Sequence, residues 1–431
     1  MALDLAKIRH QFPALHGGAL FLDNPGGTQV AKNCLDRVLE YLVEYNANHK
    51  GAFKTSRESD AVLLKARTAM ADFLNAARPE EILFGQNMTS LTFQLSRSLA
   101  RTLKPGDEVV VTRLDHDANI SPWLIIAEER DCKVRWVDFR PETGTLDRTS
   151  LLAALSGRPK IVAVGYASNS LGTINPVAEI AKLAHEAGAL VFVDAVHFAP
   201  HGPIDVRELG CDFLACSAYK FFGPHLGILY GRYDLLDGLF PYKVRPASNH
   251  LPTKLETGTM NHEAIAGLLG TIEYIEWLGQ HYAKDEAHGL ETKYQGRAFH
   301  LKQAMTAIRA YEGELSRALV RVLKETPGLT IYGLADESRF AERAPTFSFR
   351  LEGIAPRQVA EKLDLDRIYV WDGNYYALEV TRRLGVEDAG GMVRAGAVHY
   401  NTLDEVERFG KALHKLVHAE KGWLGLGLTP S

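Results

Sequence analysis

The stretch "VDAVHFAPHGPIDVRELGCDFLACSAYKFFGPHLGILYG", residues 193–231, contains the pattern that decides the fold of this chain. It includes the end of one apolar run, "ALVFVDAV", a second run, "CDFLACSA", and a third, "GILYG". Lys220 lies between aromatic residues, just before the turn that leads into the third run. Because burying an ammonium group is costly unless its charge is paired or lost, Lys220 is either a surface residue or the centre of a site.

Apolar runs alternate with helical patterns from about residue 60 to residue 235. For example, "EILFG" is followed by the helical "TSLTFQLSRSLARTL", and "KIVAVGYAS" by "VAEIAKLAHEAG". Continuous Val, Ile and Ala runs separated by helices are typical of a parallel sheet that is buried on both faces. The sequence therefore predicts an α/β fold with a mostly parallel sheet.

The pattern changes after Asn261, where two long helical stretches are followed by short strands such as "LTIYG" and "APTFSFRL". This change predicts a second, smaller α+β domain that packs beside the first. We expect a large domain at residues 17–285 and a small domain formed by residues 1–16 and 286–431.

Composition and charge exclude several classes of partner. The 431-residue chain has a formal net charge of −4, which does not favour nucleic acid or an anionic membrane. Its four scattered cysteines form no CxxC pair or zinc pattern and suit a reducing compartment. The charged N-terminus does not resemble a signal peptide, and no apolar run approaches the length of a membrane span. We expect a cytoplasmic protein with no metal site and neither a nucleic-acid nor a membrane partner.

Several polar residues follow the apolar runs at the point where each predicted strand ends, which is where doubly wound sheets bind ligands. They are Thr89, His116, Asn169, Asp194, Ser217 and Lys220. A lysine near a carboxylate on a neighbouring strand is compatible with a plain buried ion pair. It is also the arrangement of a lysine that carries pyridoxal phosphate, with Asp194 keeping the pyridine nitrogen protonated so that the ring acts as an electron sink. Ser217 and Tyr219 would then face the phosphate.

Longer motifs extend from "FLDNPGGTQV" to "VRAGAVHYNTLDEVERF" and include "DHDANISPW", "SNSLGTINPV" and "ETGTMNHEAIAGL". With residues 193–231, they make the chain similar to fold-type I pyridoxal-phosphate enzymes of the class V aminotransferase family, most closely the cysteine desulfurase-like branch. The resemblance implies a large domain with a mostly parallel seven-stranded sheet and a smaller C-terminal α+β domain. It also implies pyridoxal 5'-phosphate as cofactor, an amino-acid substrate, and a homodimer with composite active sites.

The resemblance assigns a role to each matched residue around the cofactor ring. Lys220 matches the lysine that carries the cofactor, Asp194 matches the partner of the pyridine nitrogen, and His116 matches the histidine that stacks on the ring. Asn169 and His197 match positions near the phenolic oxygen, where His197 replaces the glutamine usual in desulfurases.

Further matches concern the phosphate and the substrate. Thr89 and Ser217 match phosphate contacts, and Tyr219 stands where desulfurases often have a histidine. Thr259 matches a residue that reaches the phosphate bound by the partner subunit. Arg394 matches the arginine that grips the substrate carboxylate as a bidentate fork.

The chain departs from the desulfurase pattern in its C-terminal loop, "VWDGNYYALEV". Tyr376 takes the place of the nucleophilic cysteine, Trp371 stands where an arginine is common, and no cysteine follows Cys216. A phenol cannot carry a persulfide, so the standard desulfurase cycle does not fit. Two interpretations remain for the loop: a substrate mouth in which Tyr376 acts as a general acid, or aromatic packing at a dimer interface. The residues concerned are Trp371, Asn374, Tyr375 and Tyr376.

Thiol-less members of this superfamily act as C–S lyases, amino-acid epimerases or aminotransferases. We expect a β-eliminating C–S lyase, because the best motif matches are to sulfur-handling enzymes, with an aminotransferase or epimerase as the alternative. A cofactor-binding protein without turnover is a third possibility. The intact set of lysine, aspartate, histidine and arginine argues against it.

Overall fold

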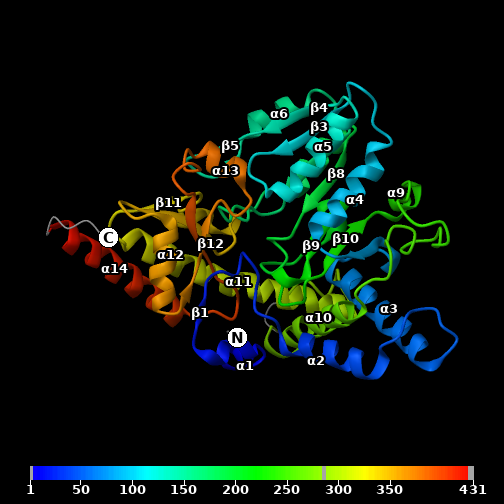
Figure 1. Ribbon diagram of the computed structural model, residues 1–431, viewed down its shortest axis with the longest axis horizontal. Coiled ribbons are helices and arrows are strands. Elements are labelled where there is room, and N and C mark those ends of the chain that lie inside the picture. The colour runs from blue at the N-terminus through cyan, green and yellow to red at the C-terminus, as the bar shows by residue number, and fades with distance from the viewer. Residues whose placement is uncertain (1–2, 284–287, 426–431) are drawn as a thin grey trace.

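The computed structural model describes residues 3–283 and 288–425, which contain one large and one small sheet (Figure 1). The large sheet has seven strands in the order β2 (Ile82–Gly85), β10 (Gly227–Gly231), β9 (Phe213–Ser217), β8 (Leu190–Asp194), β7 (Ile161–Gly165), β3 (Glu108–Thr112) and β4 (Lys133–Val137). β10 runs antiparallel to both of its neighbours, and the remaining pairs are parallel. The predicted α/β fold with a mostly parallel seven-stranded sheet is confirmed.

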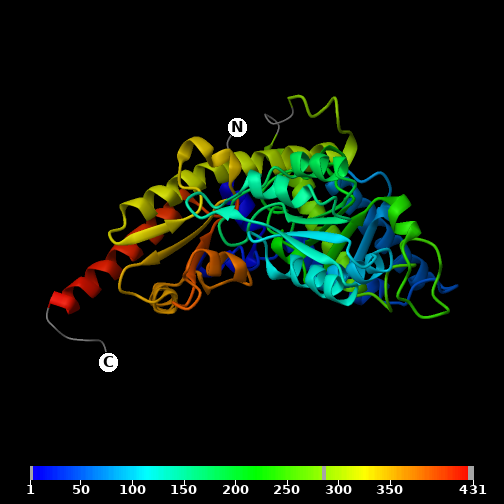
Figure 2. The same cartoon turned by 90° about the horizontal axis from the view of Figure 1, so that it is seen from above.

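Side chains on the central strands alternate between two hydrophobic clusters, as the pleat of a strand requires. On β3, Val110 packs into one cluster, whereas Val109 and Val111 pack into the other. Helices α3 (Lys54–Leu74), α6 (Arg148–Leu155), α7 (Val177–Glu186) and α10 (His262–Tyr282) contribute to the cluster of Val110, and helices α4 (Met88–Ala100) and α5 (Ser121–Glu129) contribute to the other. Figures 1 and 2 show helices on both sides of this sheet.

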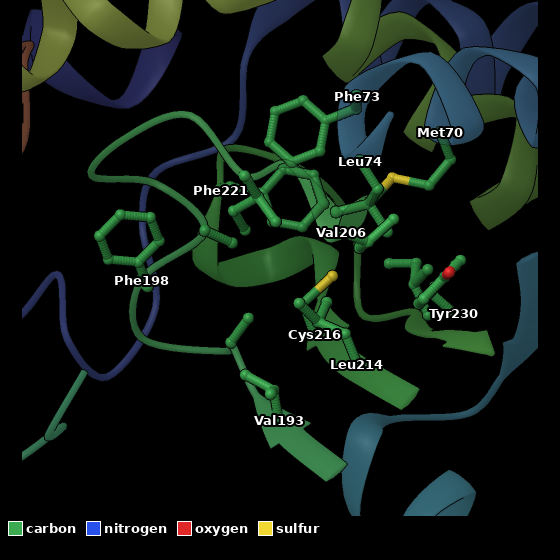
Figure 3. Close-up of a cluster of buried hydrophobic side chains, with 14 of the residues drawn as sticks. Met70, Phe73, Leu74, Val193, Phe198, Val206, Leu214, Cys216, Phe221 and Tyr230 are labelled. Carbon is green, nitrogen blue, oxygen red and sulfur yellow. The ribbon is translucent and has the colours of Figure 1, made fainter. Parts of the chain in front are cut away.

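The turn that carries Lys220 is anchored in the core by the next residue, Phe221. Its buried ring stacks on Phe73 of α3, with ring centroids 5.4 Å apart and an interplanar angle of 13°. Figure 3 shows this pair beside Met70 and Leu74, over the end of the strand that carries Cys216. The pair therefore fixes the direction in which the chain leaves β9.

The small sheet is antiparallel and has the order β11 (Leu329–Tyr332), β12 (Thr346–Leu351), β15 (Met392–Gly396) and β14 (Trp371–Gly373). Helices α11 (Gly296–Glu325), α12 (Pro356–Leu365) and α14 (Leu403–Gly425) pack against it in a separate hydrophobic cluster. α14 lies at the opposite end of the molecule from α3 (Figure 1). This part of the chain has the predicted α+β character.

Shorter elements complete the described chain. The helices are α1 (Leu5–His10), α2 (Lys32–Glu40), α8 (Val206–Leu209), α9 (Tyr233–Gly238) and α13 (Leu378–Arg383), and the strand pairs are β1 (Leu20–Phe21) with β13 (Ile368–Tyr369) and β5 (Phe139–Arg140) with β6 (Thr145–Leu146). Near the N-terminus, Ile8 and Phe12 pack into the cluster that contains Val110. α11 contributes to two clusters, because Leu301 packs into the cluster of Val110 and Leu319 into the cluster beside the small sheet. The division into a large domain at residues 17–285 and a small domain formed by residues 1–16 and 286–431 stays a prediction.

Within the described ranges, none of the helices combines the length and the apolar character needed to span a bilayer.

Replacing Phe221 by alanine should lower the free energy of unfolding by about 3–5 kcal/mol, because it removes a fully buried aromatic ring and leaves a cavity. Urea unfolding measures this loss. The control is Leu365→Ala on α12, where the side chain is 82% exposed and the change should stay within about 0.5 kcal/mol. Equal effects of the two substitutions would contradict the anchoring role of Phe221.

Candidate active site

A cavity of about 570 Å³ lies at the carboxyl ends of β2, β3, β7, β8 and β9 and is closed on one side by residues of β14 and β15. Eleven of the predicted site residues line it: Thr89, His116, Asn169, Asp194, His197, Ser217, Tyr219, Lys220, Trp371, Tyr376 and Arg394. Thr259 and Asn374 are not among the lining residues. The parallel sheet thus brings together side chains that lie up to about three hundred residues apart in sequence.

Lys220 ends a short 3₁₀ turn, Ala218–Lys220, that directly follows β9. Its Nζ donates hydrogen bonds to the carbonyl oxygens of Pro25, at 2.5 Å, and Gly26, at 2.9 Å. Burial, together with the nearby positive charge of Arg394, lowers the pKa of Lys220 to about 7, against the opposite effect of Asp194. A substantial fraction of the amine is therefore neutral near pH 7, which is the nucleophilic form.

Asp194 lies at the carboxyl end of β8 and is buried. Its Oδ1 accepts a hydrogen bond from the backbone N–H of Val196 at 2.9 Å. Burial raises the pKa of Asp194 to about 6, while that hydrogen bond and the charge of Lys220 act in the opposite direction. A buried carboxylate with a single backbone donor is suited to hold a protonated ring nitrogen.

Asp115 is a cavity residue that the sequence analysis missed. Its carboxylate accepts hydrogen bonds from Thr112 Oγ1, Gly165 N and Asn119 Nδ2. Burial raises the pKa of Asp115 to about 7, and the charge of Asp194 contributes to the rise. These bonds join the ends of β3 and β7 beside Asp194. The available signal was its position immediately before His116.

His116 presents a neutral ring to the cavity. Its Nδ1 accepts a hydrogen bond from Ala118 N at 3.0 Å, which leaves Nε2 to carry the proton. Burial, together with the charges of Lys220 and Arg394, lowers the pKa of His116 to about 4. The ring stacks on Tyr376, with centroids 5.6 Å apart and an interplanar angle of 22°. A flat neutral ring in this position is suited to stacking on an aromatic cofactor.

Tyr375 and Tyr376 both have left-handed backbone conformations, with φ of 56° and 58°. Asn169 Nδ2 donates to the carbonyl oxygen of Tyr375 at 2.9 Å, and Asp117 N donates to that of Tyr376 at 2.7 Å. The Tyr375 hydroxyl donates to the Met392 carbonyl. Side chains disfavour this conformation, so surrounding bonds must maintain it.

The side chains of this loop differ in their exposure and in their contacts. Tyr375 is buried, packs in a hydrophobic cluster of its own chain and borders the cavity, whereas Tyr376 is 75% exposed and covers the ring of His116. Trp371 is also half exposed at the cavity wall. Asn374 shapes the loop instead of lining the cavity: it donates to Glu387 Oε1 at 3.0 Å and accepts from Tyr376 N at 3.1 Å.

Arg394 enters the cavity from β15 and is only 3% exposed. Its Nη1 donates to the Asn169 carbonyl at 2.8 Å, and its guanidinium lies 4.3 Å from the centroid of the Tyr375 ring. Burial lowers the pKa of Arg394 to about 10, which still leaves it charged at neutral pH. The remaining donors of this guanidinium are suited to grip a carboxylate.

The first turn of α4 lies at another wall of the cavity. Asn87 caps this helix by accepting from Ser90 N, and Ser217 Oγ accepts from Met88 N at 3.1 Å. Thr89 belongs to the same turn and lines the cavity. A helix N-terminus flanked by hydroxyl groups is suited to bind a phosphate.

Tyr219 completes this region between Lys220 and His225. Its ring lies 4.9 Å from Lys220 Nζ and stacks on His225 with centroids 4.8 Å apart. Thr259, in contrast, is exposed on the segment that leads into α10.

Three atoms of cavity residues are buried without a hydrogen-bond partner among the described residues: Asn169 Oδ1, His197 Nε2 and Arg394 Nε. Buried polar atoms are normally paired, so these atoms are available to a polar ligand. The cavity volume lies within the usual range for cofactor sites. The residues present therefore fit pyridoxal phosphate together with a small amino acid. Within the described ranges, no group of His, Cys, Asp or Glu side chains is arranged so that it could hold a metal ion.

The fold and the cavity together define a pyridoxal-phosphate enzyme of fold type I. The chain belongs to the class V aminotransferase family, because the family model described as "Aminotransferase class-V" matches residues 20–301 and 296–409. Enzymes of this family use pyridoxal phosphate, which agrees with the fit of the cavity.

Individual proteins support the same assignment. The chain is 34% identical to "Aminotransferase-like protein FGM3" of Gibberella zeae, over 96% of this chain and 99% of that protein. It is 31% identical to a cysteine desulfurase of Pectobacterium atrosepticum, over 96% and 98% of the two chains. The solved cysteine desulfurase of Thermococcus onnurineus has a TM-score of 0.85 at 29% identity, covering 97% of this chain and 99% of that one.

Because only the neutral amine of Lys220 attacks an aldehyde, the cofactor-free protein should capture pyridoxal phosphate covalently at a rate that depends on pH. We expect the rate to rise about tenfold per pH unit up to about pH 7 and then to level off. Stopped-flow absorbance measures the rate, and borohydride reduction followed by peptide mass analysis identifies the attachment site. Covalent attachment to a Lys220→Ala variant would contradict the assignment.

Proposed function

We propose that this protein is a lyase that removes a sulfur-bearing group from the β-carbon of an amino acid by β-elimination. The observation that carries the proposal is a cavity whose residues suit the cofactor and a substrate carboxylate, with Tyr376 at the position where desulfurases have a sulfur-accepting thiol. None of the residues that line the cavity is a cysteine. Cys34, Cys211 and Cys216 are buried, and burial raises their pKa values. Sulfur would therefore leave as a free product.

Binding begins with the substrate carboxylate, which Arg394 receives through the donors that it does not use on Asn169. The Tyr375 ring against its guanidinium limits the directions from which the carboxylate can approach. This contact orients the amino group of the substrate toward Lys220, and the side chain of the substrate toward the mouth formed by Trp371 and Tyr376.

Pyridoxal phosphate, when bound, withdraws electrons from the Cα of the attached amino acid. The neutral amine of Lys220 takes the proton from Cα. Asp194 holds a proton at the pyridine nitrogen, and His116 covers the ring with its neutral imidazole. The electron pair left at Cα forms the Cα–Cβ double bond while the Cβ–S bond breaks with its electron pair on sulfur.

Tyr376 is the group that we place opposite the leaving sulfur. Its hydroxyl has a proton to give, and its ring is held over His116 by the bonds that fix the backbone of the loop. Donation of that proton to sulfur releases a thiol or persulfide. Water then converts the remaining three-carbon unit of a cysteine-type substrate to pyruvate and ammonia.

We also propose that the enzyme acts as a homodimer with composite sites. Thr259 lies outside the cavity of its own chain and is exposed. The segment before it exposes the large apolar side chains of Phe240, Tyr242 and Val244. A second copy seated on this segment would cover these side chains and bring Thr259 to the phosphate region of the neighbouring cavity.

Aminotransfer is the second candidate, because the relative from Gibberella zeae is named as aminotransferase-like and the same lysine, aspartate and arginine would serve that reaction. Epimerisation would also begin with the proton transfer to Lys220. The three reactions differ in their products.

Incubation of the holoenzyme with a panel of amino acids, cysteine and cystine included, and without any keto acid, separates these reactions. A β-elimination releases pyruvate, ammonia and a sulfur product over many turnovers, while the absorbance of the bound cofactor returns to its starting form. A single stoichiometric release of keto acid with a lasting change in absorbance would contradict the lyase and identify aminotransfer. Inversion at Cα without keto acid would identify an epimerase.

Removing the hydroxyl of Tyr376 tests its role as proton donor. Tyr376→Phe keeps the ring over His116 and should lower kcat for β-elimination about 100-fold, as loss of a general acid does. The control is Tyr233→Phe on α9, a tyrosine outside the cavity, which should leave kcat unchanged. Full activity of Tyr376→Phe with a poor leaving group would assign Tyr376 a packing role only.

A further inference from the structure

The exposed residues of the cavity lining fall into two pairs of different chemistry. Asn87 and Thr89 are exposed at the start of α4, where the lining suits a phosphate. Trp371 and Tyr376 form the other pair and are 52% and 75% exposed. All other lining residues are buried or half-buried. A substrate group that projects toward solvent away from the phosphate region therefore meets two aromatic rings.

Trp371 lies beside the groups that would hold an amino acid. It pairs with Arg394 in the antiparallel register of β14 and β15, which places both side chains on the same face of the small sheet. A β-carbon built on Gly26 would lie 3.8 Å from Cε3 of Trp371 and 3.7 Å from Nη2 of Arg394. Lys220 Nζ donates to the carbonyl oxygen of this same glycine. A substrate held between Lys220 and Arg394 therefore lies next to the indole.

Both aromatic rings keep surface that a ligand can cover. Tyr376 uses one face of its ring against His116, and about half of the Trp371 side chain is exposed. The hydrogen bond from Asp117 N to the Tyr376 carbonyl holds the backbone under this ring. Little further ordering is needed when a ligand binds, which favours affinity. Exposed aromatic side chains at the edge of a cavity are suited to recognise an apolar or aromatic group.

The charges near this aromatic pair disfavour an anionic side chain on the substrate. Asp117 follows His116 in the cavity lining, and its carboxylate accepts a hydrogen bond from Ser121 Oγ. Lys220 and Arg394 are the cations of the described lining, and the proposed reaction uses them at the amino group and the carboxylate of the substrate. A second anionic group would therefore meet Asp117 without a cation of its own.

We propose that the substrate is a cysteine whose sulfur carries an uncharged aromatic group, which packs against Trp371 and Tyr376 while Arg394 holds the carboxylate. The inference rests on the elimination proposed above and names its substrate class. The Cβ–S bond of such a thioether breaks with its electron pair on sulfur, and the Tyr376 hydroxyl gives this sulfur a proton. Overall, the thioether and one water yield a thiol, pyruvate and ammonia.

The first test measures binding of amino acids in which a methylene replaces the sulfur, so that no elimination can follow. Norvaline corresponds to S-methylcysteine, 2-amino-5-phenylpentanoate to S-benzylcysteine and 2-aminoadipate to S-carboxymethylcysteine. Titration of the holoenzyme, followed through the absorbance of the bound cofactor, gives a Kd for each. We expect the phenyl compound to bind about tenfold more tightly than norvaline, and 2-aminoadipate to bind more weakly than norvaline. Equal Kd values for the phenyl compound and norvaline, or tighter binding of 2-aminoadipate, would overturn the proposal.

The second test assigns the preference to Trp371. Trp371→Ala removes the indole beside Arg394 and should lower the preference for the phenyl compound over norvaline about fivefold. The control is Phe53→Ala, which removes an aromatic side chain that is 55% exposed and lies outside the cavity lining. It should leave the ratio of the two Kd values unchanged. An unchanged ratio in folded Trp371→Ala, even with weaker binding of both compounds, would refute the role of Trp371.

Release of pyruvate separates this proposal from the reaction on which it rests. The holoenzyme should release pyruvate from S-benzylcysteine with a kcat/KM about tenfold higher than from S-methylcysteine, since both leaving groups are alkyl thiols. Preferred binding of the phenyl compound without pyruvate from S-benzylcysteine would support the recognition and contradict the elimination. Pyruvate release with equal kcat/KM from both thioethers would support the elimination and overturn the aromatic substrate class.

Discussion

The site depends on residues 22–28, which tie the lysine turn of the large sheet to the arginine strand of the small sheet. On one side, Thr28 N donates to the Tyr219 carbonyl, and Lys220 donates to the carbonyls of Pro25 and Gly26. On the other side, Gly396 N donates to the Leu22 carbonyl, and Asn24 Nδ2 donates to the Gly396 carbonyl. Because Gly396 ends the strand that carries Arg394, the same short segment fixes both the lysine and the arginine.

The cavity keeps two cations close together with little compensation from the protein. Burial lowers the pKa of Lys220 and of Arg394, and the two charges repel each other. Asp23 faces both, yet its Oδ1 has no hydrogen-bond partner among the described residues and burial raises its pKa. The protein alone satisfies this charge pattern poorly. An anionic ligand would complete it, for example a phosphate at the first turn of α4 and a carboxylate at Arg394.

Much of this site can be predicted from the sequence, because each buried strand is an apolar run and its end is visible where that run stops. Asp194 and Lys220 follow apolar runs directly, and a parallel sheet brings such ends to one edge. Contacts between distant elements leave no such signal: Glu312 lies 111 residues from His201, on a helix whose pattern shows only its apolar face. The orientation of Asn374 away from the cavity likewise depends on Glu387 and on a backbone turn that spacing does not reveal.

The loop that carries Tyr375 and Tyr376 contains no thiol, and hydrogen bonds attach it to the rest of the site. A group that accepts sulfur covalently must reach the leaving atom and afterwards present it elsewhere, whereas a proton donor has only to remain in place. The backbone of Tyr375 and Tyr376 is held in a disfavoured conformation by Asn169 and Asp117, which follow the strands that build the cavity. Asn169 also accepts a hydrogen bond from Arg394 through its carbonyl, so the backbone of this loop and the Arg394 side chain share one partner. A phenol on a backbone held in this way meets the requirement of the proposed proton donor, which has to stay at a set distance from Arg394.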